Sequence, residues 1–118
     1  TVINSEDSIG RGVLAASYAA GCSITEIKSA ACKMLKRVLP MAINVGSPRA
    51  VSYVLLGMIN IIDLSDNINL MSHAKHLAYK LVKLYDASCS REWHWFEDRL
   101  TYCNAVLPHA LFGFYGIR

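Results

Sequence analysis

A dense group of aromatic and acidic side chains stands in the last third of the sequence. Trp93, Trp95 and Phe96 fall within four residues, and Glu97 and Asp98 follow them directly. Aromatic faces stack on the C–H faces of pyranose rings, and carboxylates bind sugar hydroxyls in fixed directions. Such rings also act as wedges in a core, but three of them so close together do not all point inward from one local surface. Two hypotheses stay open, a saccharide-binding cleft and a structural element of the core.

The acidic residues indicate how catalysis would work if this cleft were an active site. Glu97 and Asp98 are adjacent, so their side chains project in different directions and make a poor acid–base pair with each other. Glycoside hydrolysis needs two carboxyl groups about 5 to 10 Å apart. We therefore expect Glu97 or Asp98 to be the proton donor or base, with Asp7 as the second carboxylate.

Two arginines stand near the starts of apolar segments. Arg11 follows Asp7 by four residues, a spacing that suits either a stabilising pair at a helix start or two groups in a cleft. Arg49 heads an apolar segment and needs a partner, and Glu97 or Asp98 would provide it as a structural ion pair. The alternative is that both arginines hold the hydroxyls or a phosphate of a substrate.

The predicted substrate-binding set is completed by aromatic and amide side chains of the same region. Trp95 and Tyr102 would form the platform for a sugar ring, with Trp93 and Asn104 beside them. The sequence contains no glycine-rich phosphate loop and no G-x-S-x-G motif, so we expect no cofactor.

The four cysteines and four histidines do not have the spacing of a metal site. No C-x-x-C pair occurs, and His73 and His76 form an H-x-x-H pair without a third ligand nearby. We therefore expect no bound metal. The cysteines stand in or beside apolar helical stretches, which favours buried free thiols in a reducing compartment, and hence a cytoplasmic protein.

Hydrophobic periodicity predicts five helices and no clear strand. The first spans about residues 8–20, and the second opens at a capping box in residues 23–26 and ends or kinks at Pro40. The third begins at Ser47, an N-cap followed by proline at the first helical position, and extends to residue 62. The fourth spans about residues 66–85, and the fifth spans about residues 104–115 with Pro108 in its first turns.

These helices alternate in character. The first, third and fifth are apolar nearly all round, whereas the second and fourth have one apolar face. This alternation is typical of two layers in which amphipathic helices line buried ones, as in toroids of helical hairpins and in helical solenoids. The starts of the buried helices would then open onto one rim, where a binding cleft would form. An arginine near the start of the first and third helices is a faint internal repeat.

Composition limits the class of protein. The chain has 118 residues, of which 53% are hydrophobic and 18% charged, which fits one domain and excludes disorder of the whole. A net charge of +3 is too small for a typical nucleic-acid-binding domain, so no nucleic-acid partner is expected. The longest apolar stretch, residues 51–62, is shorter than the ~20 residues of a membrane span, and no signal-peptide pattern opens the chain. The basic face between Lys28 and Arg37 is expected to be solvated, with an anion-binding surface as the less favoured alternative.

The two ends suggest a piece of a longer domain. The chain begins at Thr1 without methionine and ends at Arg118 directly after an aromatic helical pattern. The last buried helix then lacks an amphipathic partner, and its apolar flank would aggregate or pair with another copy of the chain. A homo-oligomer is therefore one expectation.

Three short elements resemble a bacterial and archaeal family of α/α-toroid domains that are fused to, or encoded beside, glycosyltransferases. Residues 93–105 (WHWFEDRLTYCNA) resemble the family's W-x-W-F-E-D-x-L-T-Y-D-N-A run, residues 7–12 (DSIGRG) its D-S-x-G-R-A element, and residues 47–50 (SPRA) its S-P-R-A element. The elements occur in the family's order. Cys103 stands where the family has aspartate. If that aspartate is catalytic, this chain is impaired or the role has moved to Asp98 or Glu97.

The resemblance implies an all-α fold of antiparallel helical hairpins forming part of an α/α toroid, similar to six-hairpin glycosidases and sugar epimerases. Residues 1–118 would be one partial domain of about two and a half hairpins. The implied function is a carbohydrate-active or carbohydrate-binding domain linked to glycosyltransferase pathways, with glycoside processing as one activity. Its ligand would be a saccharide or nucleotide sugar, and its partner a glycosyltransferase. The implied funnel residues are Asp7, Arg11, Arg49, Trp95, Glu97, Asp98, Tyr102 and Asn104. The alternative from another class is a non-catalytic helical scaffold that docks a glycosyltransferase or another protein.

Overall fold

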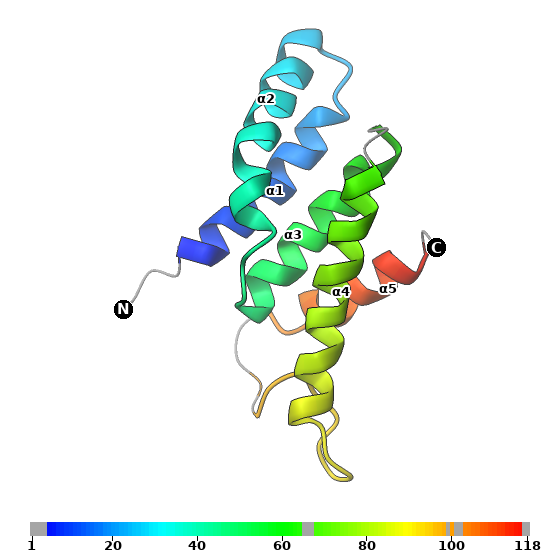
Figure 1. Cartoon of the computed structure of the whole chain (residues 1–118). Helices are drawn as coiled ribbons and strands as arrows, with labels where there is room; N and C mark the ends of the chain where they lie inside the picture. The colour runs from blue at the N-terminus through cyan, green and yellow to red at the C-terminus, as the bar shows by residue number, and fades with distance from the viewer. Residues whose placement is uncertain (1–4, 65–67, 99, 101–102, 117–118) are drawn as a thin grey trace.

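The computed structural model describes residues 5–64, 68–98, 100 and 103–116, and within these ranges it is all helical (Figure 1). The elements are α1 (Ser5–Ala20), α2 (Thr25–Ala42), α3 (Pro48–Ile61), the short 3-10 helix η1 (Ile62–Leu64), α4 (Ile68–Ser88) and α5 (Val106–Gly116). No strand occurs in the described ranges. The predicted all-α class is therefore confirmed.

Helix α3 is the centre of the packing, and it contacts α1, α4 and α5. It has no charged residue after Arg49, and its side chains are buried around most of its circumference. Two glycines allow α1 to approach it closely. A Cβ at Gly57 would lie 2.8 Å from Val13 Cγ1, and a Cβ at Gly10 would lie 3.0 Å from Tyr53 Cβ. The absence of these two side chains lets the middle turns of α1 and α3 pack closely.

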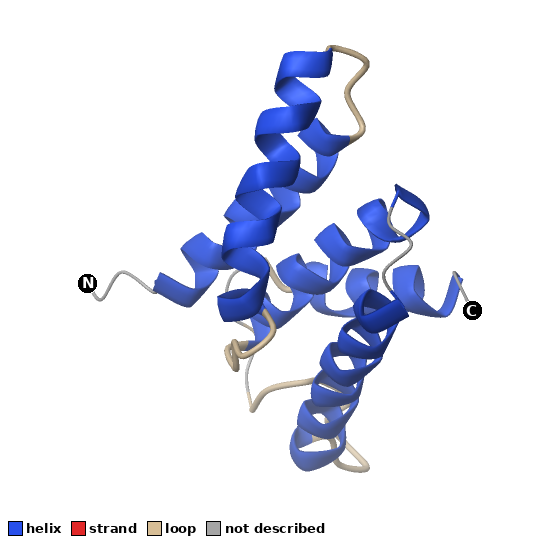
Figure 2. Ribbon diagram, turned by 45° about the horizontal axis from the view of Figure 1, so that its top comes forward, coloured by secondary structure: helices blue, strands red, loops and turns tan. Residues whose placement is uncertain are grey.

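Helices α2 and α4 are amphipathic, as the periodicity predicted. Helix α2 packs on α1, and α4 packs on α3 and α5; Figure 2 shows α1 and α2 lying side by side as a long helical pair. The buried residues of α2 are Ala31, Leu35 and Ala42, and those of α4 are Leu70, Ala74, Leu77, Ala78 and Leu81. The cations of α2 are exposed.

The helix ends agree only in part with the sequence prediction. Ser47 is the N-cap of α3 and accepts a hydrogen bond from the Ala50 amide at 3.3 Å, as predicted. The capping box predicted for α2 is wrong, because its N-cap is Ile24, whose side chain cannot accept a hydrogen bond. Helix α2 also continues two residues past Pro40 to Ala42. Helix α5 begins at Val106, so Pro108 falls in its first turn, where no backbone N–H is needed.

Helices α1 and α5 are less buried than their composition suggested. On α5, Leu107, Ala110 and Phe114 are buried, but Phe112 is 76% exposed. On α1, Tyr18 is exposed. In the described part of the chain α5 packs on α3 and α4, which cover only one of its sides. The prediction that these two helices are buried on nearly all sides, because they are apolar on nearly all sides, is therefore wrong.

The cysteines are free thiols, but the prediction that they are buried is wrong. Cys22, Cys32 and Cys89 are half-buried, and Cys103 is exposed. In the described ranges, no helix has the length and apolarity needed to cross a membrane.

Candidate functional site

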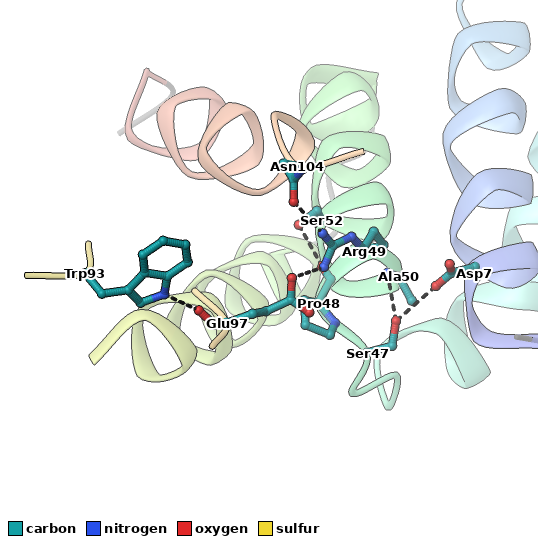
Figure 3. Close-up of polar contacts among 9 residues, drawn as sticks. All are labelled: Asp7, Ser47, Pro48, Arg49, Ala50, Ser52, Trp93, Glu97 and Asn104. Carbon is teal, nitrogen blue, oxygen red and sulfur yellow. Dashed lines mark hydrogen bonds and ion pairs between the residues drawn. The ribbon is translucent and has the colours of Figure 1, made fainter. Parts of the chain in front are cut away.

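Three segments that are far apart in the sequence meet at the start of α3. They are the first turn of α1, the first turn of α3 and the loop between α4 and α5 (Figure 3). These are the same three segments in which the sequence placed its candidate residues. Side-chain hydrogen bonds and an ion pair connect them.

The first contact joins α1 to α3. Glu6 Oε1 accepts hydrogen bonds from the backbone amides of Gly46 at 3.1 Å and Ser47 at 2.8 Å. Asp7 is 5% exposed and accepts a hydrogen bond from Ser47 Oγ at 3.0 Å. Since Ser47 Oγ also caps α3, the carboxylates of α1 fix the position at which α3 begins.

The second contact joins α3 to the loop. Arg49 is 2% exposed, forms an ion pair with Glu97, and donates a hydrogen bond from Nη2 to Asn104 Oδ1 at 3.0 Å. Burying a guanidinium is costly unless a carboxylate and further acceptors surround it. The structural partner that the sequence suggested for Arg49 is therefore present, and it is Glu97 rather than Asp98, which is exposed.

The aromatic group separates into a core residue and two half-buried rings. Phe96 is buried, with its ring centroid 5.2 Å from that of Tyr85 and 5.4 Å from that of Trp95, both in edge-to-face geometry. Trp93 and Trp95 are half-buried. Trp93 Nε1 donates a hydrogen bond to the Glu97 carbonyl at 2.6 Å, which holds the loop around the ion pair. The core hypothesis is therefore confirmed for Phe96, and the saccharide-binding hypothesis for Trp93 and Trp95 stays a prediction.

An open hollow of about 590 Å³ lies beside this loop. The residues that line it are Trp93, His94, Trp95, Leu100, Asn104, Ala105 and Pro108. Asn104 lines the hollow and also accepts a hydrogen bond from Arg49, so the hollow adjoins the Arg49–Glu97 ion pair. Trp95 Nε1 is buried and makes no hydrogen bond within the described part of the chain.

A third group lies one turn further along α1 and α3. The Arg11 guanidinium lies 5.7 Å from the centre of the Tyr53 ring, and a hydrogen bond with Tyr53 raises the pKa of Arg11. Burial raises the pKa of the Tyr53 hydroxyl, and its hydrogen bond with Cys103 raises it further, while Arg11 opposes both effects. Cys103 adopts a left-handed backbone conformation with φ of 46°.

Sequence reasoning missed Glu6 and Tyr53 as members of this region. Tyr53 lies four residues after Arg49 on α3, a spacing that places both on one helix face, so it could have been found. Glu6 gave no such signal, because its contacts are with the backbone of a distant turn.

The predicted catalytic carboxylates are not arranged as an obvious pair. Figure 3 shows Asp7 and Glu97 on opposite sides of the start of α3, with Ser47 and Arg49 between them. Asp7 is buried against Ser47, and Glu97, which is half-buried, pairs with Arg49. Tyr102 lies outside the described residues. Among the residues that are described, no group of three or more side chains could hold a metal ion.

Comparison of the chain with models of protein families, with curated proteins and with solved structures found no match. The resemblance to the toroid family therefore remains a hypothesis based on the three motifs.

Proposed function

We propose that this chain is a saccharide-binding helical domain that works with glycosyltransferase machinery, and that it forms part of an α/α toroid. The principal supporting observation is the 590 Å³ hollow, which places Trp93 and Trp95 beside the amide of Asn104. Its size falls within the roughly 300–1,000 Å³ of small-molecule sites. Two indole rings supply faces for pyranose stacking, and the amide supplies directed hydrogen bonds.

The buried network supports this assignment by fixing one wall of the hollow. Asn104 is held by Arg49, which is itself held by Glu97, so the amide is oriented before any ligand binds. A group oriented in advance loses less conformational entropy on binding. The toroid part of the proposal rests on the three sequence motifs, and the all-helical packing of α3 against α1, α4 and α5 is compatible with it.

Binding is better supported than hydrolysis. Asp7 and Glu97 already accept hydrogen bonds from Ser47 and Arg49, and they lie on opposite sides of α3. A hydrolase would need one of them to donate a proton to a glycosidic oxygen across a shared space. If the full protein does turn over a sugar, Glu97→Gln and Asp98→Asn are each expected to slow it.

The binding proposal is tested by thermal shift and calorimetry with a panel of mono- and oligosaccharides and nucleotide sugars. At least one is expected to raise the melting temperature, as any ligand of the folded state does. Trp95→Ala and His94→Ala, which alter the wall of the hollow, are expected to reduce the shift. Tyr79→Ala, an exposed aromatic on α4, serves as the matched control and is expected to leave it unchanged.

If no sugar shifts the melting temperature, or if Tyr79→Ala has the same effect as the two wall variants, the proposal is wrong. Since Trp95 also contacts Phe96, the variant proteins are first compared for stability without ligand.

A non-catalytic scaffold is the second candidate, and one observation favours it. Phe112 and Tyr115 on α5 are exposed, and Leu100 is exposed in the preceding loop. Apolar side chains gathered on one surface often mark a protein interface. A scaffold for a glycosyltransferase would bind that enzyme with an affinity that Phe112→Ser lowers and Tyr18→Ser, on α1, does not.

A further inference from the structure

A second concave surface lies between α2 and α4 and shares no lining residue with the aromatic hollow. It consists of two hollows of about 320 and 300 Å³ that share Lys36, Leu39 and Leu70. Figure 1 shows α2 in front of α1 and α4 in front of α3, so the groove runs between the two outer helices. We define these two hollows together as the α2–α4 groove.

The α2–α4 groove is apolar along its length. Its aliphatic lining residues are Ala20, Leu35, Leu39, Pro40, Ile43, Met58, Ile61, Leu64 and Leu70. Its walls are helices, whose backbone N–H and C=O groups bond within each helix and offer nothing to a polar ligand. An extended peptide would find no backbone partners here, whereas a hydrocarbon chain needs none.

The ionisable side chains among the described lining residues of the groove are basic or neutral. Lys28 and Lys36 stand on α2 and His73 stands on α4, and no carboxylate belongs to the described lining. The two lysines are exposed, so their ammonium groups can move to meet a ligand at the edge of the groove. The groove thus combines an apolar floor with cations at its margin.

We propose that the α2–α4 groove binds a single-chain anionic amphiphile. Its hydrocarbon chain lies over Leu35, Leu39 and Leu70, and its carboxylate or phosphate headgroup meets Lys36 or Lys28. Two kinds of recognition act together, since burial of the hydrocarbon chain removes apolar surface from water and the headgroup selects for negative charge. The volume of each hollow falls within the roughly 300–1,000 Å³ that small-molecule sites have. The stretch of α2 between Lys28 and Ile43 is about 22 Å long at 1.5 Å per residue. An extended chain of a dozen or more carbons fits such a length.

Cys32 provides a reporter inside this groove. It is half-buried and lines the hollow of about 300 Å³, whereas Cys103 is exposed at the other end of α3. The experiment measures the rate of maleimide labelling of each cysteine by peptide mass spectrometry, with dodecanoate or dodecyl phosphate added below its micelle concentration. At a ligand concentration ten times its Kd, occupancy is expected to slow labelling of Cys32 about tenfold and to leave Cys103 unchanged.

Charge selection is tested with ligands and variants in parallel. Dodecyltrimethylammonium, with the same chain and a positive head, is expected to protect Cys32 much less. Lys28→Gln combined with Lys36→Gln is expected to weaken protection by dodecanoate, while Lys33→Gln, an exposed lysine of α2 that does not line the groove, is expected to have no effect. Protection by only one of the two anions supports the proposal and identifies the headgroup.

Three results would overturn the proposal. The first is no protection of Cys32 by either anion, and the second is equal protection by the cationic amphiphile. The third is equal slowing at Cys103, which would indicate general adsorption or unfolding. An acidic helical peptide that protects Cys32 when neither anion does would assign the groove to a protein partner instead. None of these results depends on the sugar experiments at the aromatic hollow.

Discussion

Arg49 and Glu97, which are 48 positions apart in the sequence, form an ion pair in which the guanidinium is 2% exposed and the carboxylate 23% exposed. This pair joins the first turn of the central helix to the loop that contains both tryptophans. It therefore fixes the geometry of the proposed saccharide site without itself lining the aromatic hollow.

Loss of the Glu97 carboxylate is expected to destabilise the fold strongly. Glu97→Ala leaves the buried Arg49 without its ion-pair partner, which costs about 3–5 kcal/mol when one member of a buried pair is removed. Asp98→Ala, the exposed neighbour, is the control and is expected to change stability by no more than about 0.5 kcal/mol. Urea unfolding followed by circular dichroism measures both. Equal losses in the two variants would show that the ion pair is not a structural element.

The fold class could be predicted from the sequence, but much of the site's detail could not. Ser47 and Pro48 gave a correct helix start because the N-cap and first-turn signals are local. The start of α2 was misplaced by one residue: Ser23 predicts the N-cap by an equally local signal, but the N-cap is Ile24, in a stretch that is exposed and has no packing to explain the difference. A local pattern predicts that a helix is present better than it predicts where that helix begins.

The aromatic group illustrates the same limit at the candidate site. Nothing in the spacing of Trp93, Trp95 and Phe96 indicates which ring packs into the core. That choice depends on Tyr85, which contacts Phe96 from the end of α4. The pairing of Arg49 was anticipated because a buried charge requires a partner, but the choice of Glu97 over Asp98 depends on the path of the loop.

The hydroxyl of Ser47 is expected to contribute to stability through two hydrogen bonds. Ser47→Ala removes the cap on the Ala50 amide and the donor to buried Asp7, with an expected loss of about 1–2 kcal/mol. Ser72→Ala, an exposed position on α4, is the control and should be neutral or slightly stabilising, because alanine is the better helix former. Thermal unfolding of both proteins decides the matter. If Ser47→Ala is as stable as the parent protein, the two hydrogen bonds contribute nothing net.

Two glycines in adjacent helices are expected to respond in opposite directions to the same substitution. Gly57→Ala places a methyl group 2.8 Å from Val13 Cγ1 and 3.2 Å from the Val13 carbonyl oxygen, so overpacking costs about 1–3 kcal/mol. Gly12→Ala meets only Met34 Cε at 3.8 Å, so the gain in helix propensity of about 1 kcal/mol is retained. The two melting temperatures should therefore move apart, down for Gly57→Ala and up for Gly12→Ala. A rise in both would mean that α1 and α3 lie further apart than the structure has them.

The phenol of Tyr53 is expected to make stability depend on pH in the alkaline range. Burial, the largest cause, raises its pKa in the folded state above the ordinary value, and the hydrogen bond with Cys103 adds to the rise. A group whose folded pKa is raised binds its proton more tightly when folded, so its contribution is complete below the unfolded pKa of about 10 and is lost as pH rises through the folded pKa.

The free energy of unfolding should therefore fall more steeply above about pH 10 in the parent protein than in Tyr53→Phe. Subtracting one curve from the other removes the contributions that the two proteins share. Tyr79→Phe, at an exposed position on α4, should follow the parent curve. Absorbance of the phenolate at 295 nm, compared between the parent and Tyr53→Phe, follows the ionisation of Tyr53 directly. If the parent and Tyr53→Phe curves run parallel throughout, the phenol does not ionise differently in the folded and unfolded chains.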